Sequence, residues 1–288
     1  MSEIKIKQTF NGLSTTEWAK LSKNVWGDIK TPSRSIHQKE HGATFPEDLA
    51  ERAIKIYSKE KDLIFDPFSG TGTTLLSAYR MKRNSLGTEL NEKFYTFIQD
   101  RIRHEKSNLF DGLYEEPPQI KVVNDDCRNM LKHVEPESVQ LTFTSPPYAN
   151  FIQKSLADRK KTHKKSKLVT ENNSTIKQYS EKEEDFGNLS YVDFLNQIKG
   201  ILKDNFTVTK NGGYSIWVVK DNRNTQEGIP YIDFHSDIAR AGKEVGWLYH
   251  DLIIWDQNKQ RKLILLGYPS VFYTNQNCSF VVVFRKKV

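Results

Sequence analysis

A short apolar run that leads into a glycine-rich turn constrains the fold of this chain more than any other feature. Residues 62–66 read Asp-Leu-Ile-Phe-Asp, and residues 67–74 read Pro-Phe-Ser-Gly-Thr-Gly-Thr-Thr. A helical pattern with apolar residues between Leu75 and Tyr79 follows. We predict a buried strand, a tight turn and a helix, the unit from which doubly wound α/β sheets are built.

The same alternation of strand and helix continues along the chain. Short apolar runs predict further strands at residues 84–90, 120–123, 139–143, 214–219, 252–255 and 279–284. Amphipathic patterns predict helices that begin near Pro46, Glu92, Tyr191 and Ile232. We therefore expect an α/β fold, with a Rossmann-like, mainly parallel sheet, helices on both faces, and an antiparallel C-terminal strand that closes the sheet.

Composition narrows the class of protein. Hydrophobic residues make up 37% of the chain and charged residues 27%, which is typical of a globular protein. The apolar run at residues 280–284 is too short to cross a bilayer, and the first residues lack the apolar core of a secretory signal. Cys127 and Cys278 do not form a metal-binding or redox motif. We expect a cytoplasmic protein without a bound metal.

The glycine turn has the pattern of a ligand-binding loop. Gly70 and Gly72 permit a tight turn and let a ligand approach the backbone closely. Glu89, at the end of the next predicted strand, is spaced to accept hydrogen bonds from both hydroxyls of a ribose. A nicotinamide site needs a third glycine where Leu75 stands, and a phosphate-binding loop needs a lysine after Gly72. The turn is therefore either purely structural or suited to a ligand with a ribose and a carboxylate but no phosphate, such as S-adenosylmethionine.

A second loop, Thr144-Ser145-Pro146-Pro147-Tyr148, follows the predicted strand at residues 139–143. Consecutive prolines fix the backbone and leave no amide donors, so their carbonyls are rigid acceptors, and the serine hydroxyl adds another acceptor. Such acceptors draw hydrogen bonds from an exocyclic amine of a base and free its lone pair for attack on a methyl group. Tyr148 would stack on a base that has left the duplex. A proline-rich turn that only ends a strand is the alternative.

Together these motifs resemble the amino-methyltransferases of bacterial restriction–modification systems and phages, over roughly residues 45–284. The resemblance implies a class I methyltransferase fold, with residues 41–46 over the methionine end of the cofactor and Asp126 beside its adenine. It implies catalytic roles for Ser145, Pro146, Pro147 and Tyr148. For S-adenosylmethionine it implies binding by His41, Thr44, Phe45, Pro46, Asp66, Pro67, Phe68, Ser69, Gly70, Thr71, Gly72, Thr73, Glu89, Leu90, Asp126 and Cys127.

Three departures from the family pattern stand out. Gly42 replaces a common proline, Gln140 stands where an aspartate is frequent, and no separate target-recognition region is obvious. We expect one methyltransferase domain over residues 1–288, with an N-terminal arm at residues 1–40 and a basic insertion at residues 150–190. Its oligomeric state, monomer or homodimer, is left open.

Charge points to double-stranded DNA as the partner. The chain has a net charge of +7, and residues 154–167 carry seven basic side chains against Asp158, a local charge of +6. This segment is either a solvated loop or a clamp on the phosphate backbone. Segments 221–228 and 259–262 are further candidates for reading sequence. The candidate DNA-binding residues are Lys154, Arg159, Lys160, Lys161, Lys164, Lys165, Lys167 and Arg261.

Several reactions remain open at this point. Ser145 in the catalytic loop favours methylation of cytosine N4 in a flipped-out base, with adenine N6 as the close alternative. Methylation of an RNA base or a protein glutamine amide is a third possibility, and a catalytically silent DNA-binding relative a fourth. Methylation at cytosine C5 needs a nucleophilic thiol in a Pro-Cys context, which neither Cys127 nor Cys278 has.

Overall fold

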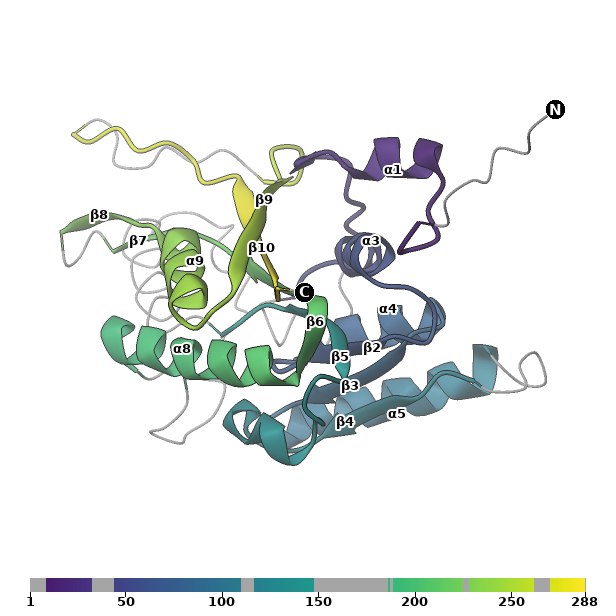
Figure 1. Cartoon of the computed structure of the whole chain (residues 1–288). Coiled ribbons are helices and arrows are strands. Elements are labelled where there is room, and N and C mark those ends of the chain that lie inside the picture. Colours follow the sequence, from purple (N-terminus) through teal and green to yellow (C-terminus); the bar gives the residue numbers. More distant parts are fainter. Residues whose placement is uncertain are drawn as a thin grey trace.

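An eight-stranded sheet forms the centre of the protein. The computed structural model describes residues 9–32, 44–109, 117–147, 186, 189–224, 228–261 and 270–287. The sheet has the order β1-β9-β10-β6-β5-β2-β3-β4, and β7 and β8 form a separate hairpin (Figure 1). The strands are β1 (Val25–Trp26), β2 (Leu63–Asp66), β3 (Asn84–Thr88), β4 (Ile120–Val123), β5 (Val139–Thr144), β6 (Thr209–Val219), β7 (Asn222–Asn224), β8 (Ile229–Ile232), β9 (Leu248–Asp256) and β10 (Cys278–Arg285).

The strand pairing confirms the predicted fold class. Strands β4, β3, β2, β5 and β6 are parallel to one another, whereas β10 runs antiparallel to both β6 and β9. The prediction that residues 279–284 close the sheet is wrong, because β10 lies between two strands and β1 forms that edge. The consecutive side chains Val281 to Phe284 are all fully buried, as is typical of an interior strand covered on both faces.

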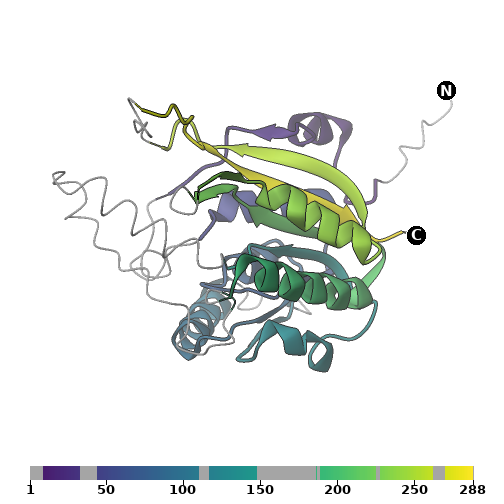
Figure 2. The same ribbon diagram turned by 90° about the vertical axis from the view of Figure 1, so that its left-hand side faces the viewer.

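Helices cover both faces of this sheet. They are α1 (Thr15–Leu21), α3 (Glu47–Tyr57), α4 (Thr73–Arg80), α5 (Glu92–Leu109), α8 (Tyr191–Val208), α9 (Phe234–Glu244) and the short 3-10 helix η1 (Cys127–Lys132). The core side chains of α3 share one apolar cluster with Val281 and Val283 of β10. Those of α8, α9 and η1 share another with Val282 and Phe284. Helices α8 and α9 lie side by side on that second face (Figure 2).

Several boundaries differ slightly from those predicted. Pro46 is the N-cap of α3 and not part of its first turn. Strand β6 begins at Thr209, before the predicted residue 214, and β9 begins at Leu248, before residue 252. Strand β1, the hairpin β7–β8 and helix η1 were not predicted. Within the part of the chain that the structure describes, no helix is both long and apolar enough to span a bilayer.

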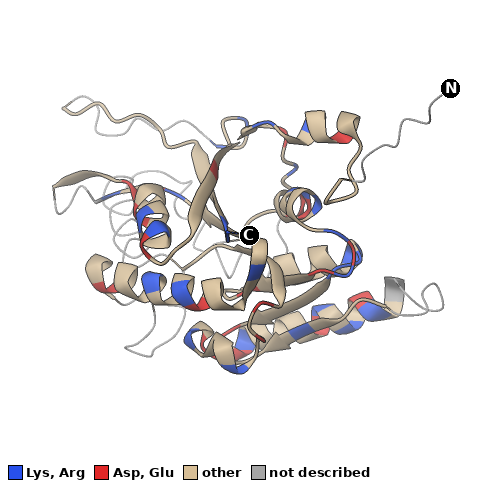
Figure 3. Ribbon diagram, viewed as in Figure 1, with Lys and Arg blue, Asp and Glu red and all other residues tan. Residues whose placement is uncertain are grey.

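Charged residues are interspersed along the described helices. Lysines and arginines of α5 and α8 alternate with aspartates and glutamates (Figure 3). The positive net charge of the chain is therefore not concentrated on these two helices.

The strand order brings the two predicted loops to one place. The chain passes from β2 to β3 and β4 on one side and from β5 to β6 on the other, so the order reverses between β2 and β5. The loops that follow two parallel neighbours leave the same edge of the sheet, and ligands of doubly wound folds bind where the order reverses. The turn after β2 and the loop after β5 meet at this edge.

Candidate active site

The turn between β2 and α4 is held in a compact shape by its own backbone and by Asp66. The amide of Phe68 donates to Asp66 Oδ1 at 3.1 Å, and the hydroxyl of Ser69 donates to the Asp66 carbonyl at 3.0 Å. Gly70 and Gly72 have φ of +56° and +79°, in the left-handed region that favours glycine. Gly72 is also the N-cap of α4, so the turn leads directly into the helix.

Strand β3 lies unusually close to this turn because it contains Gly87. A Cβ atom at Gly87 would lie 2.1 Å from Ser69 Oγ and 3.0 Å from the Asp66 carbonyl. Sequence reasoning missed this residue, although a glycine inside a strand often marks a close approach of another segment. The next residue, Thr88, donates its hydroxyl to the carbonyl of Pro67 at 2.8 Å.

Glu89 directly follows β3 and lies beside the glycine turn. Its carboxylate accepts the amide of Gly70 at 2.7 Å and the amide of Asn91 at 2.8 Å. A carboxylate has about four lone-pair positions and can therefore accept several hydrogen bonds at once. The side chain predicted to accept ribose hydroxyls therefore also fastens the glycine turn to β3.

Asp126, expected beside the adenine of the cofactor, lines the pocket and is held by Arg128 at the start of η1. It caps η1 by accepting the Arg128 amide at 2.9 Å, and its other oxygen forms an ion pair with the Arg128 guanidinium at 2.6 Å. Burial disfavours the charge of Asp126, but the hydrogen bonds from Arg128 outweigh burial and hold the pKa of this carboxyl below its ordinary value. Asp126 is thus an ionised acceptor beside the pocket, partly engaged by Arg128.

Strand β5 is tied directly to the glycine turn. All side chains of β5 are buried, and the hydroxyl of Thr144 donates to Asp66 Oδ1 at 2.6 Å. Burial raises the pKa of Asp66 to about 6, although the hydrogen bonds from Thr144 and Phe68 act in the opposite direction. Asp66, predicted to bind the cofactor, is only 1% exposed and joins the two loops from behind.

A pocket lies at this edge, with about 650 Å³ of space including its open mouth. Seven of its residues were predicted to bind the cofactor and three to catalyse, whereas Thr88, Asn91 and Phe186 were not predicted. The lining residues are Pro67, Phe68, Gly70, Thr88, Glu89, Leu90, Asn91, Asp126, Cys127, Ser145, Pro146, Pro147 and Phe186. The structure therefore places the glycine turn and the proline loop around one space.

Apart from Asp66 and Arg261, the remaining predicted residues fall into two groups. The first group lies outside the pocket lining: Ser69, Thr71, Gly72 and Thr73 belong to the glycine turn, and Thr44, Phe45 and Pro46 precede α3. The centre of the Phe45 ring lies 5.1 Å from that of Phe143 of β5, in an edge-to-face arrangement, so residues 44–46 lie against β5. The second group lies outside the described residues: His41, Tyr148, Lys154, Arg159, Lys160, Lys161, Lys164, Lys165 and Lys167.

Arg261 is the predicted DNA contact that the structure does describe. It is exposed at the end of the segment after β9, and its Nε donates to Gln257 Oε1 at 2.8 Å.

Phe186 forms the apolar wall of the pocket. Its ring lies 5.7 Å from that of Phe68 and 6.2 Å from that of Phe194 in α8, and the guanidinium of Arg128 lies 5.6 Å from its centre. The surrounding segment is charged and aperiodic, so local sequence gave no signal for this residue.

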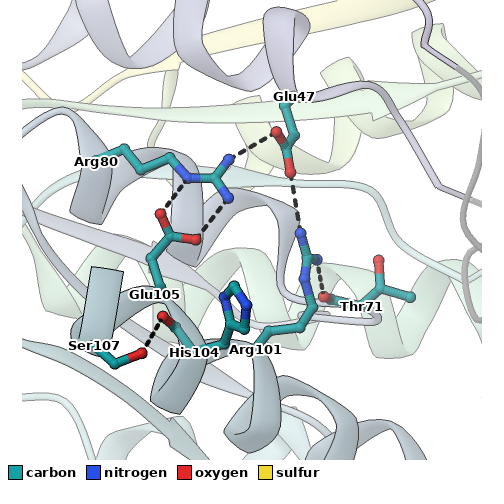
Figure 4. Close-up of polar contacts among 7 residues, drawn as sticks. All are labelled: Glu47, Thr71, Arg80, Arg101, His104, Glu105 and Ser107. Atoms are coloured by element: carbon teal, nitrogen blue, oxygen red, sulfur yellow. Dashed lines mark hydrogen bonds and ion pairs between the residues drawn. The ribbon is translucent and has the colours of Figure 1, made fainter. Parts of the chain in front are cut away.

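An ionic network lies next to the glycine turn and contacts it at Thr71 (Figure 4). Arg101 of α5 donates to the Thr71 carbonyl at 2.5 Å and to Glu47 of α3 at 3.0 Å. Arg80 of α4 contacts Glu47 at 2.8 Å and Glu105 of α5 at 2.7 Å. Burial lowers the pKa of Arg101. Hydrogen bonds donated by Arg80 hold the pKa of Glu105 below its ordinary value. The network thus joins α3, α4 and α5, and Arg101 connects it to the backbone of the turn.

Comparison with known sequences finds a DNA methylase family and several type II methyltransferases. Residues 2–100 and 139–287 match a family described as DNA methylase. The chain is similar to the type II methyltransferase M.MthZI of Methanothermobacter thermautotrophicus, with 40% identity over 82 residues, 27% of this chain and 23% of that protein. It is similar to the type II methyltransferase M.BglI of Bacillus subtilis, with 36% identity over 126 residues, 43% of this chain and 34% of that protein. The aligned part thus spans about a quarter to a third of these two relatives.

Among solved structures, TrmN from Thermus thermophilus matches 88% of this chain and 54% of its own, with 13% identity and a TM-score of 0.48.

Proposed function

This chain belongs to the DNA methylase family, whose members are S-adenosylmethionine-dependent amino-methyltransferases, and from that premise we propose that it methylates the exocyclic N4 of a cytosine in double-stranded DNA. The single observation that carries this proposal is the pocket that the glycine turn and the Ser145-Pro146-Pro147 loop line together. A cofactor loop alone would fit many enzymes. A rigid acceptor loop in the same space restricts the chemistry to a group that donates hydrogen bonds, such as an amine.

The residues of the pocket fit S-adenosylmethionine. The ionised Asp126 and the carboxylate of Glu89 are acceptors for hydroxyl and amino groups, and Phe68, Leu90 and Phe186 offer apolar surface to a purine. Bound there, S-adenosylmethionine would supply an electrophilic methyl group on a sulfonium.

The proline loop would orient the amine. Pro146 is buried and Ser145 half-buried at the end of the rigid strand β5, so their carbonyl and hydroxyl oxygens are fixed in position. Hydrogen bonds from the amine to these acceptors would direct the nitrogen lone pair out of conjugation with the ring. Positioning of this kind, without a strong base, accounts for much of the rate gain in reactions between bound groups.

Asp66 and Thr144 would keep the two loops in register. Because the Thr144 hydroxyl joins the end of β5 to Asp66 at the end of β2, the acceptors of one loop cannot move far from the glycine turn of the other. Neither side chain lines the pocket, so we propose a positioning role for both.

Cytosine N4 is favoured over adenine N6 by the sequence of the loop. Ser145 stands where enzymes that act on adenine commonly carry an aspartate, so the serine favours cytosine, although both side chains can accept a hydrogen bond from an amine. We further propose that Tyr148 stacks on the flipped base. The basic residues between Lys154 and Lys167, together with Arg261, would bind the phosphate backbone.

The direct test is product identification. The protein is incubated with labelled S-adenosylmethionine and mixed-sequence duplex DNA, the DNA is digested, and the labelled nucleoside is identified by mass and chromatography. We expect N4-methylcytidine in its deoxy form. Labelled N6-methyldeoxyadenosine would overturn the base assignment, and cofactor binding without any labelled nucleoside would indicate a silent relative.

A further inference from the structure

The side chain of Arg128 joins two walls of the pocket that come from distant parts of the chain. Its Nε donates to Asp126 Oδ1 at 2.9 Å, and its Nη2 donates to Asp126 Oδ2 at 2.6 Å. Its guanidinium also lies 5.6 Å from the centre of the Phe186 ring. Asp126 and Phe186 both line the pocket, whereas Arg128 does not. Arg128 thus lies outside the lining and contacts two of its members.

The two contacts use different properties of the guanidinium. Its planar fork of N–H donors matches the two oxygens of a carboxylate, and its face attracts an aromatic ring. The fork fixes the plane of the Asp126 carboxylate. The Phe186 ring is only 4% exposed and also packs edge-on against Phe68, another residue of the pocket lining. Arg128 therefore links an acidic wall of the pocket to an apolar one.

The ion pair with Arg128 leaves the Asp126 carboxylate able to bind a ligand. Oδ1 accepts the Arg128 amide at 2.9 Å as well as Nε, whereas Oδ2 accepts only Nη2 among the residues that the structure describes. Each carboxylate oxygen has two lone pairs, so Oδ2 can accept a second donor. A hydroxyl or amino group of a ligand in the pocket would be such a donor.

We infer that Arg128 is a positioning residue for S-adenosylmethionine, which holds the Asp126 carboxylate and the Phe186 ring in fixed orientations for the adenosyl group. The inference rests on the proposed function, in which this pocket binds the cofactor. An adenosyl group has a flat ring with an amino group and a ribose with two hydroxyls, so it needs an apolar surface and a polar acceptor in a fixed arrangement. One guanidinium holds a residue of each kind.

The charge of Arg128 also favours the ionised form of Asp126. Burial disfavours this form, but the hydrogen bonds and the charge of Arg128 outweigh burial, so the pKa of Asp126 lies below its ordinary value. Without the guanidinium, mainly the backbone amide of residue 128 would oppose burial, and the pKa should rise. The other ionisable groups near Asp126 are the thiol of Cys127, whose pKa burial raises, the carboxylate of Glu89 in the same pocket, and Asp125 with its partner His133. These groups are the same in wild type and in an Arg128 variant, so a difference between the two reports on Asp126.

The test is calorimetric titration of S-adenosylmethionine into the full-length protein at about pH 8 and about pH 5. Arg128→Met keeps a long side chain and the backbone cap of η1 but removes the fork. We expect it to bind about tenfold more weakly at the higher pH, the order of one charge-assisted hydrogen bond. Towards the lower pH its affinity should fall further relative to wild type, because Asp126 becomes protonated.

Arg128→Lys tests the fork without loss of charge. A lysine ammonium is a point charge that cannot form the two parallel hydrogen bonds of the fork. Arg128→Lys should therefore regain the pH profile of the wild type but not its full affinity. Lys132→Met is the matched control, because Lys132 is exposed on the same helix η1 and its replacement removes the same charge. It should bind the cofactor as the wild type does at both pH values.

Four results would contradict the inference. Wild-type affinity of Arg128→Met, together with weakened binding in Glu89→Gln, would overturn it and leave the pocket as the cofactor site. Tighter binding by Arg128→Met would overturn it too, because the guanidinium would then compete with the cofactor for Asp126. Weaker binding without a change in pH profile would indicate a merely structural role. Unchanged binding in both Arg128→Met and Glu89→Gln would also overturn the assignment of this pocket to the cofactor.

Discussion

At the scale of single residues, two small features hold the glycine turn in place. Gly87 leaves room for Ser69 against β3, and Asp66 accepts the hydroxyl of Thr144 from β5. Gly87 provides space and Asp66 a buried carboxyl group, so substitution of each should have a different measurable effect.

Alanine at position 87 should disturb the turn. The added methyl group would lie 2.1 Å from Ser69 Oγ and 3.0 Å from a backbone oxygen, so the turn must shift. We expect a loss of about 1–3 kcal/mol in the free energy of unfolding, as for other overpacked sites, and weaker binding of S-adenosylmethionine. Denaturant unfolding and calorimetric titration measure the two effects.

Gly200 supplies the control for this experiment. It lies exposed in α8, and a Cβ there would meet no atom within 4 Å. Gly200→Ala should raise the free energy of unfolding by about 0.5–1 kcal/mol, because alanine is the better helix former. Equal destabilisation by both substitutions would contradict the role given to Gly87.

Asp66 predicts a pH dependence of stability. Its pKa is raised from 3.8 to about 6 by burial, so the folded protein binds the proton more tightly than the unfolded chain. Its contribution to stability is therefore largest at low pH and is lost as pH rises through 6. This shift of the Asp66 pKa corresponds to a change of about 3 kcal/mol in the free energy of unfolding between low and high pH. We expect the stability of wild type relative to Asp66→Asn to fall between pH 4 and pH 7; a difference that is constant or rises with pH would refute this account.

At the scale of elements, α5 acts on the pocket without lining it. Arg101 reaches the Thr71 carbonyl from a helix whose sequence predicted only an amphipathic surface, because the partners Glu47 and Thr71 are 54 and 30 residues away. The longer strands and helices were predictable, since each has its own local pattern, whereas the short elements β1, β7, β8 and η1 were not. The ionic network between the helices was not predictable either.

Loss of Arg101 should loosen the turn. Arg101→Ala removes the donor to Thr71 and leaves Glu47 with Arg80 alone. Hydrogen bonds to charged groups contribute about 1.5–3 kcal/mol each, so we expect a loss of that order in stability together with weaker cofactor binding. Arg103→Ala is the control, since that side chain is 76% exposed and pairs with Asp100 on the same helix. Similar losses in both variants would argue against a specific role for Arg101.

At the scale of the whole molecule, parallel strands made part of the site predictable. The glycine turn, Glu89 and the Ser145-Pro146-Pro147 loop each follow a predicted strand, and the carboxyl ends of parallel strands share an edge. The position of β10 was not predictable in the same way, because strand order depends on long-range pairing. The contact of Arg223 with Thr274, 51 residues away, likewise has no local signal.

In the proposed mechanism, the glycine turn and Glu89 bind the cofactor, whereas the Ser145-Pro146-Pro147 loop orients the amine in the same pocket. Calorimetric titration of S-adenosylmethionine into Glu89→Gln and Ser145→Ala tests this claim most directly. We expect Glu89→Gln to weaken binding roughly tenfold or more, since a charge-assisted hydrogen bond is lost. Ser145→Ala should bind as the wild type does while its methyl transfer is abolished. Loss of cofactor binding in Ser145→Ala, or wild-type binding in Glu89→Gln, would contradict the division of roles.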